Sequence, residues 1–243
     1  MFPLAVNAGA RIPHDGDPLF GQVMLLLNGT SVVTKDDSSF NRAMTAFGGM
    51  ALNSGVTLFG NPTYEAPTSG AASWLRCDDV TWAGSFGTQE WCIEGFYMPL
   101  QNVDDSAVNR LGAVFETMRA PSGKLFCSCK NLDNTSYTID SGSALSLSTW
   151  YYYAFVRDNS LSLSVLRMYF GQPGGSAVQT GSFTGIVASN AVGSSQGSPK
   201  EAFGLSLTNR NHGRFGPFRF TIGNARYYSG TAFPVPSGPF PAR

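Results

Sequence analysis

The chain of 243 residues is poor in charge, because only 13% of its residues are Asp, Glu, Lys or Arg and the net charge is +0. This balance excludes the basic surface that nucleic acids require and the polybasic segment that anionic membranes attract. Soluble proteins that act without partners usually carry more surface charge, which keeps them from associating. We therefore expect that partners or copies of this chain cover part of the surface, and we expect no nucleic-acid partner.

Long apolar runs are missing too. The longest early run is Val23–Leu27, far below the roughly 18 residues that cross a bilayer. No basic and apolar signal segment follows Met1. These absences predict no membrane insertion and a protein that is made and used without export through a signal-peptide route.

Histidine is scarce, since only His14 and His212 are present, far apart and outside any metal-ligand spacing. The cysteines lie in no cluster with histidine: Cys77, Cys92, Cys127 and Cys129. Zinc needs four convergent ligands, and disulfide frameworks are typical of short exported chains. We therefore expect reduced cysteines that pack as small apolar residues, with Cys127 and Cys129 on one strand face.

Helical patterning is weak throughout, whereas strand patterning is abundant. Gln89–Met98 is apolar on both faces, with Trp91 and Cys92 on opposite sides, as in a strand in the middle of a stacked sheet. Further short runs lie between turn residues: Val23–Leu27, Leu125–Lys130, Trp150–Arg157, Leu161–Phe170, Ala202–Leu207 and Phe215–Ile222. About a dozen such strands predict an all-β sandwich or barrel.

The rest of the organisation follows from Gly, Ser and Pro. No repeat or linker is visible, so we expect an N-terminal arm at 1–17 and a single domain at 18–243. Gln172–Ser198 is rich in Gly and Ser, which predicts a long surface loop with one short strand, Gly185–Ala188. Prolines stand at positions 234, 236, 239 and 241. Because proline lacks an amide hydrogen, we expect this tail to lie extended across the fold rather than in a sheet.

Few residues suggest chemistry. Glu90 and Glu94 share one strand face, and many β-sandwich glucanases carry Glu-x-Asp-x-Glu there, with nucleophile and acid at the spacing of a retaining mechanism. Here the central position is Cys92, so packing is the preferred interpretation. Asp36–Ser39 and Asp104–Asp105 have the oxygen ligands that calcium prefers, but paired aspartates are more often turn formers. We expect no cofactor, with Ca²⁺ as the alternative.

Aromatic side chains favour a binding function. Rings at strand ends or turns can stack on sugars, although core packing explains most of them: Trp74, Trp82, Tyr151, Tyr152, Tyr153, Tyr227 and Tyr228. The glycosylation triplets Asn28–Thr30 and Asn134–Ser136 are interpreted as chance matches, because no export signal accompanies them.

Five segments in order resemble the laminin G-like, concanavalin A-like lectin/glucanase sandwich, in the version common in tailed-phage virion proteins. They cover most of residues 17–240: Asp17–Asn28, Phe47–Leu52, Gln89–Pro99, Trp150–Arg157 and Phe218–Tyr228 with its Pro-rich tail. The chain departs from the pattern at Pro217–Phe218 and at Arg167 and Met168, which interrupt the pattern in Val165–Gly171. No calcium or sugar position matches residue by residue, so no site residue is assigned.

The resemblance implies a two-sheet antiparallel jelly roll, with Arg226 and Tyr227 as structural residues that fix the tail. It implies a non-enzymatic structural protein of a phage particle: a tail-fibre or baseplate component, or a capsid decoration protein, that binds surface glycans. The expected partners are other virion proteins and copies of this chain, with a trimer favoured, and the expected place is the virion, assembled in the host cytoplasm. The alternatives are a glycan hydrolase that uses Glu90 and Glu94, and a free lectin module.

Overall fold

Antiparallel strands make up nearly all of the regular structure. In the computed structural model, the described residues are 17–66, 73–78, 89–101, 106–111, 115–119, 122–130, 136–159, 163–187, 200–204, 213–226 and 230–242. They form sixteen strands and one short 3-10 helix, η1 (Phe20–Gln22), and the strands pair into two sheets. The expected all-β, two-sheet sandwich is confirmed.

The larger sheet has nine strands and is called the large sheet below. Its order across the sheet is β16 (Ala232–Pro234), β13 (Ser176–Val187), β12 (Leu163–Gly171), β11 (Tyr151–Asp158), β6 (Trp91–Pro99), β15 (Gly213–Ile222), β4 (Asn61–Glu65) and β3 (Ala51–Leu58). The ninth strand, β1 (Val23–Leu27), pairs with the second half of β15, beside the part of β15 that pairs with β4.

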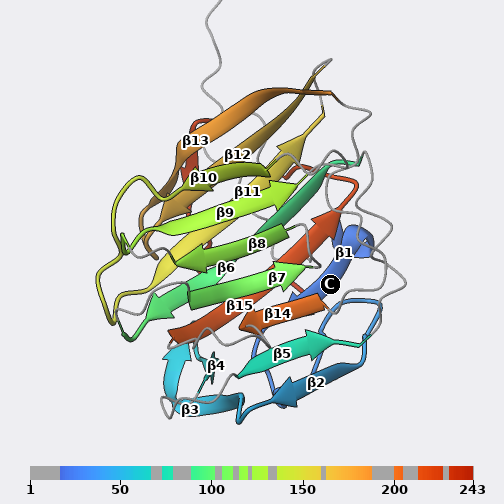
Figure 1. Ribbon diagram of the computed structural model, residues 1–243. Coiled ribbons are helices and arrows are strands. Elements are labelled where there is room, and N and C mark those ends of the chain that lie inside the picture. Colours follow the sequence, from blue (N-terminus) through green and yellow to red (C-terminus); the bar gives the residue numbers. More distant parts are fainter. Residues whose placement is uncertain are drawn as a thin grey trace, which may run out of the picture.

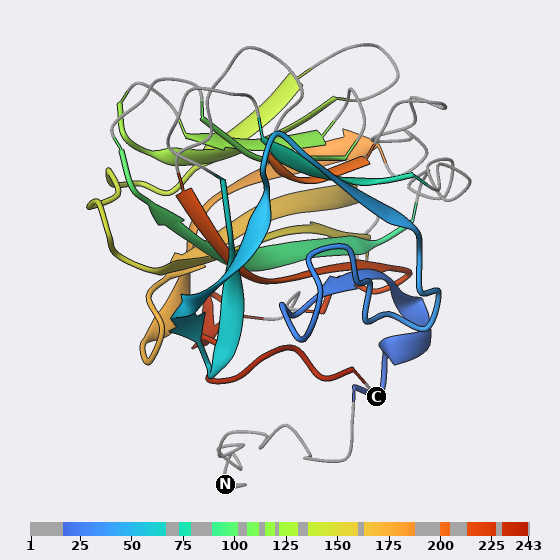
Figure 2. The same cartoon turned by 90° about the horizontal axis from the view of Figure 1, so that it is seen from below.

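The other sheet has seven strands and is called the small sheet. Its order is β10 (Ser136–Asp140), β9 (Leu125–Lys130), β8 (Phe115–Arg119), β7 (Ser106–Leu111), β14 (Lys200–Gly204), β5 (Trp74–Cys77) and β2 (Met44–Phe47). Figure 1 shows the small sheet in front of the large sheet, and Figure 2 shows the two as stacked layers.

Strand β6 lies in the middle of the large sheet, as its two-sided apolar pattern predicts. Trp91 and Tyr97 point into the core between the sheets, where Trp91 packs edge-on against Phe155 at 5.3 Å between ring centroids. Cys92 and Phe96 point to the opposite face and belong to a second apolar cluster. The large sheet therefore buries side chains on both of its faces.

The second cluster is covered by the two ends of the chain. Phe240 of the C-terminal tail packs against Phe96, and Val235 of the tail and Phe20 near the start of the fold belong to the same cluster. Figure 2 shows the tail and the first residues of the fold on the side of the large sheet away from the small sheet. The tail is therefore the extended strap that the prolines predict.

One part of the tail does join a sheet, so the expectation that it would not is wrong there. Strand β16 pairs with β13, with Pro234 opposite Ser176 and Phe233 opposite Ala177. Proline is tolerated because β16 is the outermost strand and Pro234 is its last residue.

The predicted loop at Gln172–Ser198 is also wrong over most of its described part. β13 is a strand of twelve residues paired with β12. Its weak pattern has a structural reason, because Gly181 lies where a Cβ atom would come within 2.6 Å of Ile139 on β10. The Thr180 hydroxyl donates to the carbonyl of Asp140 at 2.8 Å, which joins the two sheets along this side. Arg167 and Met168 do not interrupt β12, since Met168 is buried in the core.

Candidate functional site

The outer face of the large sheet contains a buried cluster of charges. It consists of Asp17, Glu94, Arg219 and Arg226, and none of these side chains exposes more than 8% of its surface. Arg219 bridges the two carboxylates: Nη2 lies 2.7 Å from Glu94 Oε1, and Nη1 lies 2.9 Å from Asp17 Oδ2. The Arg219 guanidinium also lies 4.4 Å from the centroid of the Phe240 ring. The cluster therefore connects the start of the fold, its central strands and its tail.

Glu94 is held on both oxygens of its carboxylate. Oε1 accepts hydrogen bonds from Arg219, and the Tyr152 hydroxyl donates to Oε2 at 2.6 Å. Glu94 is 0% exposed. Glu90 lies just before β6, where one of its carboxylate oxygens accepts the backbone N–H of Asn159 at 3.2 Å. The structure thus gives Glu94 a packing role, and this carboxylate does not reach a surface on which a glycan could lie.

Asp17 is the carboxylate that receives both arginines. Burial alone would raise its pKa, but the hydrogen bond and the charge of Arg226, with the charge of Arg219, hold the pKa of Asp17 below its usual value. Although the sequence places Asp17 at the end of the expected arm, its side chain belongs to the folded part of the molecule.

The turn after β15 is built to position Arg226. Its backbone N–H donates to Asn224 Oδ1 at 2.7 Å, and its φ of 48° lies in the left-handed region. Nε donates to the Thr221 hydroxyl at 2.8 Å, and Nη2 donates to Asp17 at 2.7 Å. Arg226 therefore has a structural role, in which it binds Asp17 and Thr221, whereas Tyr227 lies outside the described residues.

The aspartates of the first loop stabilise a turn. Asp36 is buried and accepts hydrogen bonds from the backbone N–H groups of Leu26, Ser38 and Arg42 and from the Ser38 hydroxyl. Asp37 pairs with Lys35 at 2.9 Å. The turn-forming interpretation therefore holds for Asp36. In the described parts of the chain, no three His, Cys, Asp or Glu side chains form a group that could hold a metal ion.

The four cysteines are free and buried, as expected. Cys127 and Cys129 on β9 and Cys77 on β5 all face the core between the sheets. Cys92 faces the outer cluster of the large sheet. Burial, with the nearby Glu94 carboxylate, raises the pKa of the Cys92 thiol well above its usual range, so the thiol stays protonated.

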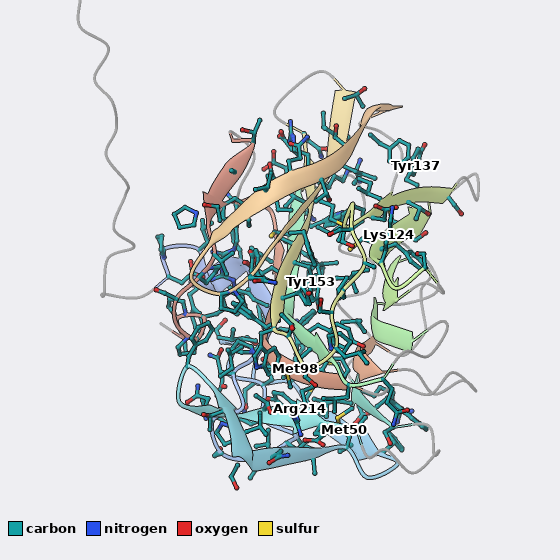
Figure 3. All side chains as sticks on the ribbon, turned by 90° about the vertical axis from the view of Figure 1, so that its left-hand side faces the viewer. Met50, Met98, Lys124, Tyr137, Tyr153 and Arg214 are labelled. Atoms are coloured by element: carbon teal, nitrogen blue, oxygen red, sulfur yellow. The ribbon has the colours of Figure 1, made fainter. Side chains whose placement is uncertain are left out.

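Of the four candidate aromatic rings among the described residues, three pack inside the molecule. Tyr151 and Tyr153 lie in the core between the sheets, and Tyr152 lies in the outer cluster of the large sheet. Figure 3 shows Tyr153 between the two layers of strands. Trp74 is partly exposed on the small sheet, where it stacks on Phe47 with 4.7 Å between ring centroids.

Asn28 of the first glycosylation triplet is buried, and its side-chain amide donates to the carbonyl of Phe240 at 2.8 Å. This side chain anchors the tail and is not available for a glycan. Several residues singled out in the sequence lie outside the described residues: His14, Trp82, Asp104, Asp105, Asn134 and Thr135 of the second glycosylation triplet, His212, Tyr227 and Tyr228.

The outer face of the small sheet differs, because none of the described segments covers it. Along β9 the inward side chains Leu125, Cys127 and Cys129 are fully buried, whereas Phe126 and Ser128 between them are partly exposed. Thr138 on β10 is exposed and donates to the Ser128 hydroxyl at 3.2 Å. This face is therefore polar and open in the described part of the chain.

A shallow hollow of about 190 Å³ lies on this open face over β9 and β10. It is lined by one aromatic ring, one ion pair and two hydroxyl groups: Ser122, Lys124, Phe126, Thr138 and Asp140. Lys124 Nζ lies 3.2 Å from Asp140 Oδ2, and these side chains are 34% and 45% exposed. Figure 3 shows Lys124 beside the small sheet. We call this group the β9–β10 hollow.

Sequence reasoning missed the β9–β10 hollow. The pattern of Leu125–Lys130 predicts the strand and its two faces, but it predicts no strand at Ser136–Asp140. The register, which places Asp140 directly opposite Phe126, arises only when β10 pairs with β9. One signal in the sequence indicates the strand: the apolar Ile139 stands between the polar residues Thr138 and Asp140.

Comparisons with known proteins identify the fold. No protein-family model matches the chain, and no curated protein matches its sequence. Among solved structures, the binding domain of botulinum neurotoxin DC in complex with SialylT is similar, with a TM-score of 0.59, 11% identity, and coverage of 84% of this chain and 48% of that chain. The chain thus spans about half the length of the neurotoxin binding domains that it matches.

Two further structures match over nearly their whole length. Domain 4 of AbnA, a GH43 extracellular arabinanase from Geobacillus stearothermophilus, in complex with arabinotriose, has a TM-score of 0.53 and 14% identity, with 83% of this chain and 93% of that chain covered. The PL-14 alginate lyase from Aplysia kurodai has a TM-score of 0.51 and 6% identity, with 82% and 99% covered. The fold is a concanavalin A-like jelly roll of the lectin/glucanase type.

The described part of the chain contains no helix with the length and apolar character needed to cross a membrane.

Proposed function

We propose that this chain is a non-enzymatic structural protein of a tailed-bacteriophage particle that binds surface glycans through the outer face of its small sheet. The β9–β10 hollow is the observation that carries the glycan part. An aromatic ring can stack on the apolar face of a sugar while nearby charged and hydroxyl groups bind its hydroxyls. Phe126, Lys124 and Asp140 bring these groups together on an open surface.

The fold is compatible with this function in other proteins. The matched arabinanase domain holds arabinotriose, and a matched neurotoxin domain holds SialylT. Because fold alone does not fix function, these neighbours support the proposal only together with the chemistry of the hollow.

The arrangement of carboxylates favours binding over hydrolysis. Most glycosidases use two carboxyl groups on either side of the scissile bond. Asp140 is the one carboxylate among the described residues that line the β9–β10 hollow, and Glu94 is enclosed under the tail. The hydrolase that would use Glu90 and Glu94 therefore gains no support from their positions.

The phage part of the proposal is supported by the sequence pattern of the closing strand, the Ala225–Arg226 turn and the Pro-rich tail, which resembles tailed-phage virion proteins. The low charge suits a chain whose surface is covered within a particle. In the proposed arrangement, residues 1–16 dock on another virion protein, and copies of the chain assemble as a homo-oligomer, with a trimer favoured.

Mass spectrometry of purified virions, with copy number, tests the structural role. Several hundred copies indicate capsid decoration, and a few trimers indicate a tail appendage. A chain that is absent from the particle but binds a glycan array is a free lectin module, and the structural role is then rejected.

A glycan array with the purified wild-type chain tests binding, and release of reducing sugar from host polysaccharide tests hydrolysis. Binding without release is the expected result, and release by the wild-type chain overturns the non-enzymatic assignment. Loss of release in Glu94→Gln would not identify a catalytic residue, because the same substitution disturbs the buried charge cluster.

A further inference from the structure

The β9–β10 hollow combines three kinds of group at fixed positions. Phe126 stands directly opposite Asp140 in the register of β9 and β10. Lys124 precedes β9 and reaches Asp140 Oδ2 at 3.2 Å. Thr138 lies two residues before Asp140 on β10, and its hydroxyl donates a hydrogen bond to the hydroxyl of Ser128 on the neighbouring strand β9. The apolar ring and the polar groups therefore line a single recess.

The carboxylate of Asp140 is held in place from several directions. Its Oδ1 accepts the backbone N–H of Gly142 at 2.7 Å, where a φ of 77° lets the chain turn back toward Asp140. The backbone carbonyl of Asp140 accepts the Thr180 hydroxyl of the other sheet at 2.8 Å. A site on strands whose side chains are fixed in this way is better organised for binding than one on a free loop.

We propose that the β9–β10 hollow is a subsite for one neutral, hydroxyl-rich sugar residue of a glycan; this inference rests on the proposed function. The Phe126 ring lies against the apolar face of the sugar. Asp140 Oδ2 accepts hydrogen bonds from sugar hydroxyls, and the Lys124 ammonium donates to a neighbouring hydroxyl or to the ring oxygen.

The ion pair determines the class of sugar. Lys124 and Asp140 are the two charged residues among the described residues that line the hollow, and their charges cancel. A uronic or sialic acid would bring a second carboxylate next to Asp140 and compete with it for Lys124, which is unfavourable for like charges at short range. A neutral sugar uses both partners of the pair without separating their charges.

The site is also suited to mutagenesis. Exposed ion pairs contribute only about 0–1 kcal/mol to stability, so substitutions at Lys124 and Asp140 change binding chemistry with little effect on folding. The chain offers matched controls away from the hollow. Phe40 is an aromatic ring that is 46% exposed, and Lys35 forms an ion pair with Asp37 at 2.9 Å.

The test uses the full chain and two sets of probes: neutral arabino-, gluco- and galacto-oligosaccharides, and oligosaccharides of uronic acids and sialylated sugars. Affinity is measured by calorimetry, and contact of the sugar with the aromatic ring by saturation-transfer NMR. The variants Phe126→Leu, Asp140→Asn and Lys124→Met are compared with the controls Phe40→Leu and Lys35→Met. Thermal melts verify that every variant is folded.

The expected result is binding of a neutral oligosaccharide that weakens at least about tenfold in the three hollow variants and is unchanged in the two controls. Phe126→Leu is further expected to remove the transfer signal of the ring-facing sugar protons. If the wild-type chain binds no glycan, the proposed function itself fails. If it binds a glycan with equal affinity in wild type and hollow variants, only the subsite is wrong. Tighter binding of an acidic sugar that depends on Lys124 overturns the neutral class.

Discussion

The central strands of the large sheet are buried on both faces, whereas β5 and β10 of the small sheet are buried on only one. All nine residues of β6 and all eight of β11 are buried, but on β10 only Ile139 is buried, and on β5 buried and partly exposed residues alternate. The tail and the first residues of the fold cover the outer face of the large sheet, and no described segment covers the outer face of the small sheet (Figure 2). The charged side chains of the two sheets therefore differ in exposure. Those under the tail are buried and hold the fold together, whereas Lys124 and Asp140 on the small sheet are exposed and remain available to a ligand.

The largest expected effect separates these two uses of charge. Glu94→Gln leaves Arg219 with an incomplete buried partner, and we expect the free energy of unfolding to fall by about 3–5 kcal/mol. Chemical denaturation measures it. The matched control is Glu65→Gln, since Glu65 bonds Arg214 at 2.8 Å but both side chains are 22% exposed. In Glu65→Gln the free energy of unfolding is expected to fall by no more than about 1 kcal/mol. Equal losses would show that burial does not distinguish the two pairs.

The cover itself is tested by Phe240→Ala. Phe240 is buried against Phe96 and the Arg219 guanidinium, and removal of a buried Phe ring costs about 3 kcal/mol or more. Phe40→Ala removes a ring that is 46% exposed and is expected to stay within about 0.5 kcal/mol of wild type. The denaturant midpoints of Phe240→Ala and Phe40→Ala are measured and compared with that of wild type. A stable Phe240→Ala protein would mean that the tail is not part of the cooperative unit.

The side where the two sheets meet is tested by Gly181→Ala. The added Cβ atom would lie 2.6 Å from Ile139 Cγ2, and overpacking of this kind costs about 1–3 kcal/mol. Gly238→Ala is the control, because no atom lies within 4 Å of a Cβ at that position. Thermal unfolding of the two variants shows whether β10 and β13 are locked together, and identical melting curves would argue against the contact.

The charge cluster also predicts a dependence of stability on pH. The pKa of Asp17 is lower in the folded state than in the unfolded chain, so its contribution is complete above the unfolded value of about 3.9 and is lost as the pH falls through the folded value. Arg219, Arg226 and, through Arg219, Glu94 surround this carboxylate. The thermal midpoint is therefore expected to fall in acid less steeply in Asp17→Asn than in wild type. Parallel profiles would exclude Asp17 as a source of the acid sensitivity.

The smallest effect on stability belongs to the open face. Lys124→Met is expected to change the free energy of unfolding by less than about 1 kcal/mol, because the Lys124–Asp140 pair is well exposed. Chemical denaturation beside Glu94→Gln gives the direct contrast between a surface pair and a buried one. A large loss in Lys124→Met would place this pair among the structural charges and weaken its assignment to a ligand.

Local patterns in the sequence predict much of the fold, because they depend on side chains two residues apart. Leu125–Lys130 forms a strand with the predicted bounds, and the segment around Trp91 is the central strand that its two-sided apolar pattern indicates. The full length of β13 is not predicted, because its Gly and Ser residues weaken the local strand pattern. These residues lie against β10 and β16, which are distant in the sequence.

The candidate site was less predictable than the fold. The sequence favours packing for Glu94 but leaves a catalytic pair with Glu90 as an alternative, because strand alternation fixes which face a residue occupies but not what covers that face. Arg219, the ion-pair partner of Glu94, lies 125 residues away from it in the sequence. Asp17, the other carboxylate that binds Arg219, lies 202 residues away from that arginine. Phe126 and Asp140 became neighbours only through the β9–β10 register.

Four properties can be derived from the order of the residues alone: the chain is all-β, its central strands are apolar on both faces, its cysteines pack as apolar residues and its tail runs extended. These properties follow from side-chain alternation, from the chemistry of proline and from composition. The contacts between distant segments became visible with the three-dimensional arrangement: the tail and the first described residues cover one sheet, Asn28 and Arg219 hold Phe240 of the tail there, and a polar hollow stays open on the other sheet. Burial and ion pairing depend on residues brought together from distant parts of the chain, whereas strand formation depends on neighbours in the sequence.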